Sequence, residues 1–112
     1  MCGHKYEQDR ILRTMVMIVD DVYAFFRAVG ITRSHAHFSV EHMGYGRRYY
    51  DYLRCSRAQP NVRAVFRLAL TLLDIATDSN RTPDENRCAS NLGKRAFANV
   101  ISRCRPDQPS KR

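Results

Sequence analysis

The residues between positions 32 and 63 offer the clearest chemistry in the sequence, and that chemistry is the recognition of anions. Every Lys or Arg in this stretch is an arginine, and the carboxylates are only Glu41 and Asp51. The arginines outnumber the carboxylates by four, which is half of the net charge of +8 on the chain. The planar guanidinium group forms paired hydrogen bonds with phosphate oxygens and with the edge of guanine. This concentration of arginine predicts a surface that binds nucleic acid.

Two kinds of contact are expected from this stretch. A helix over about residues 46–54 is expected to contact the edges of bases. The residues expected at these edges are Arg47, Arg48 and Asp51, with Tyr45 and Tyr52 beside them. The residues expected at phosphates are Arg33, Ser34, Arg54, Arg57 and Arg63. Ser34 would act through backbone N–H groups at a helix N-terminus, where the helix dipole favours an anion. Alternatively, Arg47 and Arg48 form a solvated face and pair with Glu41 or Asp51.

The other aromatic and imidazole side chains of this stretch are expected to be structural. Tyr49 and Tyr50 are predicted in the core, because a packed tyrosine ring can still place its hydroxyl group at water. His35, His37 and His42 are predicted at the surface, with a phosphate contact as the alternative.

No combination of residues assembles a catalytic or metal site. His35 and His37 are close in sequence, but nothing at a suitable spacing completes a metal site. Asp20 and Asp21 are adjacent, so their side chains point to different sides of a helix. The chain also lacks a glycine-rich phosphate loop. We therefore predict that it is not an enzyme and uses no metal and no cofactor.

The cysteines have no spacing typical of a metal or redox site. Cys2, Cys55, Cys88 and Cys104 are scattered without a Cys-x-x-Cys pair, so they are expected as free thiols or small apolar residues. Cys88 and Cys104 are expected to be buried on the last helix.

Length and composition limit the class of protein. A chain of 112 residues is one ordinary domain, and 44% hydrophobic residues are too many for a disordered polybasic tail. The longest apolar run is far shorter than the roughly 18 residues of a membrane span. No apolar segment typical of a secretory signal is evident, so a cytoplasmic protein without membrane contact is expected.

Apolar residues recur at three- and four-residue steps, which predicts an all-α fold. The predicted helices span residues 11–29, 34–42, about 46–54, 62–76 and 83–104, and residues 105–112 are a flexible tail. Ser34 and Asn61 are predicted N-caps, and Thr82 with Glu85 forms a capping box before Pro83. The expected fold is a compact bundle of about five helices in one domain, residues 1–104.

Each long helix is expected to bury one apolar face. For residues 62–76 the predicted face is Val62, Val65, Phe66, Ala69, Leu72, Leu73 and Ala76. For residues 83–104 it is Cys88, Ala89, Leu92, Ala96, Phe97, Val100 and Ile101. The apolar faces of residues 11–29 and 88–101 either form an interface with a second copy or pack on each other within one chain.

Residues 34–54 have the features of a helix-turn-helix. Such a motif needs a small residue where the two helices cross and a glycine in the turn of three or four residues that joins them. It also needs apolar residues on the inner face of the second helix. Ser39, either Gly44 or Gly46, and Tyr50 with Leu53 meet these needs.

Several motifs extend this pattern over about residues 20–77. They are His35-Ala36-His37-Phe38-Ser39, Met43-Gly44, Arg47 to Leu53, and Gln59-Pro60-Asn61 before Val65 to Ala69. In these motifs the chain resembles the lambda-repressor-like (Cro/C1-type, XRE) helix-turn-helix family of DNA-binding proteins. The spacing from Phe38 to Gly44 is one residue longer than is usual in that family. Either the turn contains an insertion, or His42 occupies a position that is normally aliphatic.

These features predict a sequence-specific regulator of transcription, of bacterial, plasmid or phage type, that binds double-stranded DNA by operator occupancy. It would act at the nucleoid as a homodimer, because one recognition helix contacts only a few base pairs. A second hypothesis is a helical adaptor or antiactivator whose arginines bind another regulatory protein. A third, weaker hypothesis is binding of single strands through arginine and stacked tyrosine.

Overall fold

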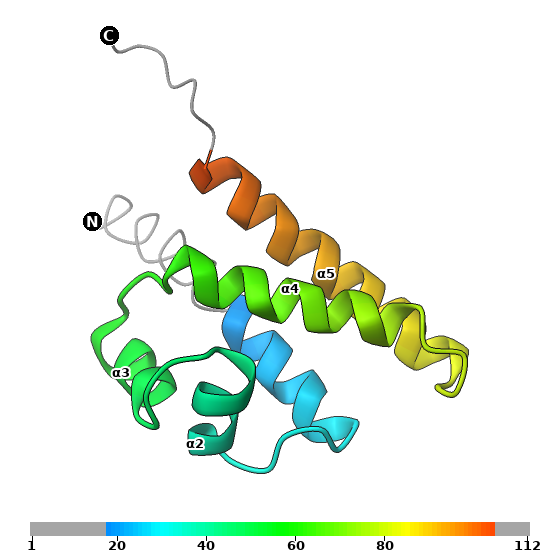
Figure 1. Cartoon of the computed structure of the whole chain (residues 1–112), viewed down its shortest axis with the longest axis horizontal. Helices are drawn as coiled ribbons and strands as arrows, with labels where there is room; N and C mark the ends of the chain where they lie inside the picture. Colours follow the sequence, from blue (N-terminus) through cyan, green and yellow to red (C-terminus); the bar gives the residue numbers. More distant parts are fainter. Residues whose placement is uncertain (1–17, 105–112) are drawn as a thin grey trace, which may run out of the picture.

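The computed structural model of the chain describes residues 18–104, and its regular elements are all helical (Figure 1). They are a helix over residues 18–28, α2 (His35–His37), the π-helix η1 (Phe38–His42), α3 (Tyr49–Ser56), α4 (Val62–Ala76) and α5 (Pro83–Cys104). Residues 18–104 contain no strand, so the predicted all-α class is confirmed. The start of the helix predicted over residues 11–29 and the tail predicted over 105–112 lie outside the described residues.

The predicted starts of α2, α4 and α5 are confirmed by their capping hydrogen bonds. The Ser34 hydroxyl accepts from the backbone N–H of His37 at 3.1 Å, and the Asn61 side chain accepts from that of Arg63 at 2.9 Å. The Thr82 hydroxyl accepts from the backbone N–H of Glu85 at 3.1 Å. Each bond provides an acceptor for an N–H group that has no partner within its own helix.

The helices α4 and α5 lie side by side and are joined by a short loop (Figure 1). Small residues let them approach closely: Ala89 and Ala96 are fully buried, and a Cβ atom at the buried Gly93 would lie 3.5 Å from Cβ of Leu72. This close pair forms one wall of the core.

The core lies where residues 18–28, η1 and α3 meet the α4–α5 pair. Phe26 and Phe38 are both fully buried, and their rings meet edge to face with centroids 5.8 Å apart. Val22 and Leu92 belong to the same buried cluster. The apolar faces of the first and last described helices therefore pack into one core within one chain, which was one of the two predicted outcomes.

The predicted apolar face of α4 is partly wrong. Val65, Ala69 and Leu72 are buried as expected, but Phe66 is 42% exposed and Leu73 is 43% exposed. The core instead takes Ala64, Leu68 and Ile75. Apolar residues surround most of this helix, so its periodicity allowed more than one buried face and the neighbouring helices selected one.

The predicted face of α5 also needs correction at its edges. Ala89, Leu92 and Ala96 are buried, whereas Ile101 is 54% exposed. Cys88 and Cys104, expected in the core, are exposed free thiols, as is Cys55. The buried face of α5 consists of Leu92 and three small residues, Ala89, Gly93 and Ala96, and Cys88 and Cys104 lie outside it.

Candidate nucleic-acid interface

The stretch from Phe38 to Gly44, one residue longer than the spacing that the resemblance implies, runs through the π-helix η1. The backbone N–H of Met43 donates to the carbonyl of Phe38 at 3.1 Å, five residues back, as in a π-helix. Met43 is fully buried, so it fills the apolar position at the end of this helix. The half-buried ring of His42 packs 4.9 Å from that of Phe26, and its Nε2 bonds to the carbonyl of Ile31 at 3.1 Å.

The connection from η1 to α3 is longer than predicted. It spans residues 43–48, six residues rather than three or four. Gly44 has φ +76°, the left-handed region that favours glycine, and Gly46 is not among the residues with positive φ. α3 consequently begins at Tyr49 rather than near residue 46, and it continues to Ser56, two residues beyond its predicted end at about residue 54.

Ser39 joins the two short helices. It is fully buried, and its hydroxyl accepts from the backbone N–H of Tyr50 at 3.0 Å and donates to the carbonyl of His35 at 2.9 Å. Tyr50 and Leu53, each 2% exposed, form the inner face of α3 as predicted. The start of α3 is therefore held on η1 by a buried hydrogen bond as well as by apolar packing.

Tyr50 is also anchored through its hydroxyl group. The hydroxyl donates a short hydrogen bond to the carboxylate of Asp20, and the guanidinium of Arg54 lies 5.8 Å from the ring centroid. Burial, and then the bond to Asp20, raises the pKa of Tyr50. This tyrosine is a neutral core residue, which agrees with the prediction that it packs inside.

The three histidines predicted at the surface are half-buried and hydrogen-bonded. His35 Nδ1 lies 2.6 Å from Oδ1 of Asp51, and His37 Nδ1 lies 2.8 Å from the hydroxyl of Thr32. One oxygen of Asp51 is therefore already engaged within the protein, which weakens the assignment of Asp51 to a base edge. The histidines therefore act as hydrogen-bonded parts of the packing, with the ring of His35 4.8 Å from that of Tyr50.

The six arginines of residues 32–63 are all exposed, and five of them are free. We call an arginine free when its guanidinium group makes no hydrogen bond, ion pair or ring contact within residues 18–104. The free arginines are Arg33, Arg47, Arg48, Arg57 and Arg63. The exception is Arg54, whose Nε lies 4.0 Å from Asp20 Oδ1. The alternative pairing of Arg47 and Arg48 with Glu41 or Asp51 is not observed.

Arginines of the described residues outside this stretch are all engaged. Arg81, Arg87 and Arg95 form ion pairs with carboxylates. The remaining three arginines donate hydrogen bonds to other oxygen atoms. They are Arg27, Arg67 and Arg103. The tertiary structure therefore decides which guanidinium groups are free, and the number of arginines in each part of the sequence does not.

Three of the predicted site residues meet at one concavity of about 330 Å³. Arg33, Ser34 and Arg47 line it, and Glu41 lies on the same surface. Arg48 immediately precedes α3, and Arg57 follows its last residue with φ +59°. Arg63 lies in the first turn of α4. The structure places Arg33 and Arg47 together although they are fourteen positions apart in the sequence.

Tyr45 and Tyr52 are joined by Tyr49 into a stack that the sequence reasoning did not predict. The rings of Tyr45 and Tyr49 are 4.4 Å apart with an interplanar angle of 18°, and those of Tyr49 and Tyr52 are 6.5 Å apart at 26°. The Tyr49 hydroxyl accepts from the backbone N–H of Asn61 at 2.7 Å. Burial raises the pKa of Tyr49. The three-residue spacing of Tyr49 and Tyr52 indicates a shared face of α3 for that pair, whereas Tyr45 lies before the helix and had no such signal.

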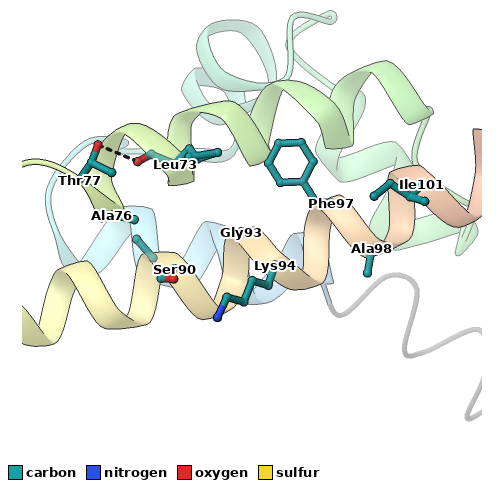
Figure 2. A pocket seen from close by; sticks show the side chains of 10 residues that line it. Leu73, Ala76, Thr77, Ser90, Gly93, Lys94, Phe97, Ala98 and Ile101 are labelled. Atoms are coloured by element: carbon teal, nitrogen blue, oxygen red, sulfur yellow. Dashed lines mark hydrogen bonds between the residues drawn. The ribbon is translucent and has the colours of Figure 1, made fainter.

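An apolar groove of about 540 Å³ lies between α4 and α5, on residues separate from the arginines (Figure 2). Its lining includes Leu73, Ala76, Phe97 and Ile101, with Lys94 at the same surface. In Figure 2 the ring of Phe97 lies between the two helices. Leu73 and Ile101, which the core leaves exposed, therefore lie on the same groove.

Comparison with known proteins identifies the family. Residues 19–109, most of the chain, match the model of a family of unknown function, DUF6626, and the chain therefore belongs to that family. No curated protein and no solved structure matches the chain. Within residues 18–104, no helix is long and apolar enough to cross a membrane, and no three His, Cys, Asp or Glu side chains gather as a metal site.

Proposed function

We propose that this protein is a sequence-specific double-stranded DNA-binding protein that regulates transcription by occupying an operator. The observation that carries the proposal is the distribution of free arginines: those of residues 18–104 all lie between positions 33 and 63, on and around two short packed helices. An arginine already paired with a carboxylate must give up that pair to bind a phosphate, whereas an exposed free guanidinium group need not. The proposed action is binding alone, without catalysis.

In this proposal α3 and the residues just before it enter the major groove. Arg47 and Arg48 immediately precede the first turn of α3, the end of a recognition helix that contacts base edges. The Ser39 to Tyr50 hydrogen bond keeps α3 in a constant position on η1. The residues assigned to phosphates are Arg33, Ser34, Arg54, Arg57 and Arg63.

Fluorescence anisotropy on two duplexes tests the proposal. One duplex comes from the DNA upstream of the protein's own gene, the other has the same composition in scrambled order, and both are titrated over a salt series. A preference of about 10³-fold or more at physiological salt is expected for a specific regulator. Equal affinity that disappears with added salt would refute sequence-specific binding.

A pair of double variants assigns the contact surface. Arg47→Ala with Arg48→Ala is expected to weaken binding to the preferred duplex by at least about tenfold, because each base-edge contact contributes about 1–3 kcal/mol. Arg87→Ala with Arg95→Ala removes the same charge from α5 and is the matched control. If both double variants lose the same affinity, net charge rather than α3 is responsible.

We further propose that two copies bind together through the groove between α4 and α5. α3 has eight residues and can contact only a few base pairs, so two half-sites are needed for specificity. The apolar face of residues 18–28 is already used in the core, whereas Leu73 and Ile101 stay exposed on the groove. Ile101→Glu is expected to convert a dimer to a monomer in sedimentation velocity. A monomeric wild-type protein at micromolar concentration would contradict this.

A second candidate function is an adaptor that binds another regulatory protein. The six-residue connection before α3, longer than a helix-turn-helix turn, favours it, as does the engagement of Asp51 by His35. In that case the free arginines would face an acidic partner protein. Failure to bind either duplex at low salt would favour this function over the first.

A further inference from the structure

We propose that the tyrosine stack, Tyr45, Tyr49 and Tyr52, is a platform on which an unpaired nucleobase of a nucleic-acid strand stacks. The three rings lie nearly parallel, with successive centroid distances of 4.4 and 6.5 Å. Tyr52 is the end member and is 55% exposed, so its ring remains open to a further planar group. Such a site goes beyond the proposed contacts to a duplex, because paired bases have both faces covered by their neighbours.

The stack is held in place before any ligand binds. The hydroxyl of Tyr49 accepts from the backbone N–H of Asn61, which ties the middle ring to the start of α4. The backbone N–H of Tyr45 donates to the carbonyl of Ser39 at 3.0 Å, and that of Tyr52 donates to the carbonyl of Arg48 at 2.8 Å. A base that stacks on rings already in position pays a smaller entropic cost than one that must order them.

The surroundings of the stack match the backbone of a nucleic-acid strand. Free arginines lie on every element that holds the rings: Arg48 immediately before Tyr49, Arg57 at the end of α3, and Arg63 two residues after Asn61. Arginines beside exposed aromatic rings are the combination by which proteins bind single strands, with phosphates on the cations and bases on the rings.

The exposed end of the stack has little role in folding. Tyr23 and Tyr50 use their hydroxyl groups in hydrogen bonds to Arg27 and Asp20, whereas the hydroxyl of Tyr52 has no partner among the described residues. More than half of Tyr52 is accessible to water, so its burial contributes little to the core. The proposal assigns this exposed ring to contact with a base.

Binding of a short single strand that carries 2-aminopurine at its centre tests the platform. We expect the protein to quench the 2-aminopurine fluorescence, and to bind a strand with an abasic site at that position about 5- to 150-fold more weakly. The abasic strand has the same number of phosphates, so the difference reports the base alone. DNA and RNA versions of the strand are compared, and base-dependent binding of either one supports the proposal.

Three variants separate stacking from general effects. Tyr52→Leu is expected to reduce binding of the base-containing strand to the level of the abasic strand, while Tyr52→Phe, which keeps the ring, retains the wild-type affinity. Phe66→Leu removes an exposed aromatic ring on α4 and should leave binding unchanged. Circular dichroism confirms that each variant is folded.

The results that overturn the platform differ from those that overturn operator binding. Equal affinity for the abasic and complete strands, an unaffected Tyr52→Leu variant, or no binding of either strand would overturn the platform. None of these results changes the measured preference between the two duplexes. Conversely, a protein without duplex preference could still bind an unpaired base through Tyr52.

Discussion

Replacing Ser39 by alanine tests whether one buried hydroxyl group holds α3 on η1. Ser39 is fully buried, and the change removes the acceptor of the Tyr50 N–H and the donor to the His35 carbonyl. A buried donor left without an acceptor costs about 1–3 kcal/mol. The higher helix propensity of alanine returns up to about 0.5 kcal/mol. We therefore expect Ser39→Ala to lower the free energy of unfolding by about 0.5–2.5 kcal/mol.

Urea unfolding followed by far-UV circular dichroism measures this loss. With a slope of about 1–3 kcal/mol per molar urea for a chain of this size, the midpoint should fall by about 0.2–2.5 M. Ser56→Ala is the matched control: Ser56 is exposed, and water can replace its bond to the carbonyl of Tyr52, so a change within about 0.5 kcal/mol is expected. Equal losses for the two variants would refute the reasoning, because they would show that the Ser39 bond contributes no more than a surface hydroxyl.

Two further predictions concern the same part of the fold. Gly44→Ala should destabilise the protein by about 1–2 kcal/mol in urea unfolding, because Gly44 has φ +76° and a Cβ there would meet the side chain of Arg67 at 2.8 Å. Gly46→Ala, at a position with nothing within 4 Å, should be nearly neutral, and the opposite order would contradict the assignment of the turn glycine. Burial lowers the pKa of His42, so the unfolded chain takes up its proton first and the free energy of unfolding should fall as the pH drops below about 6.5. In His42→Gln this fall should be smaller, and an unchanged pH profile would show that another group causes it.

Local structure could be predicted because short-range interactions decide it. Ser34, Asn61 and Thr82 each accept a hydrogen bond from a backbone N–H two or three residues ahead, and such bonds depend on side-chain type and spacing alone. The bounds of α5 and the inner position of Tyr50 and Leu53 on α3 follow from the same short-range signals.

The candidate site was predictable in composition but not in arrangement. The spacing from Phe38 to Gly44 left open an insertion in the turn or an unusual position for His42, and only the tertiary structure shows the π-helix η1 followed by the buried Met43. Periodicity could not choose the buried face of α4, because apolar residues surround most of it. The stack of Tyr45 on Tyr49 requires the particular path of residues 43–48, which no local pattern specifies.

The sequence by itself determined the helical class, the starts of α2, α4 and α5, and the accumulation of arginine between residues 32 and 63. These properties depend on composition and on residues within one or two helical turns of each other. The tertiary structure decided which apolar faces are buried, which tyrosines stack and which arginines are free. The pairing of Arg95 with Asp21, 74 positions away, illustrates the reason: whether a charge has a partner depends on residues that only the folded chain brings together.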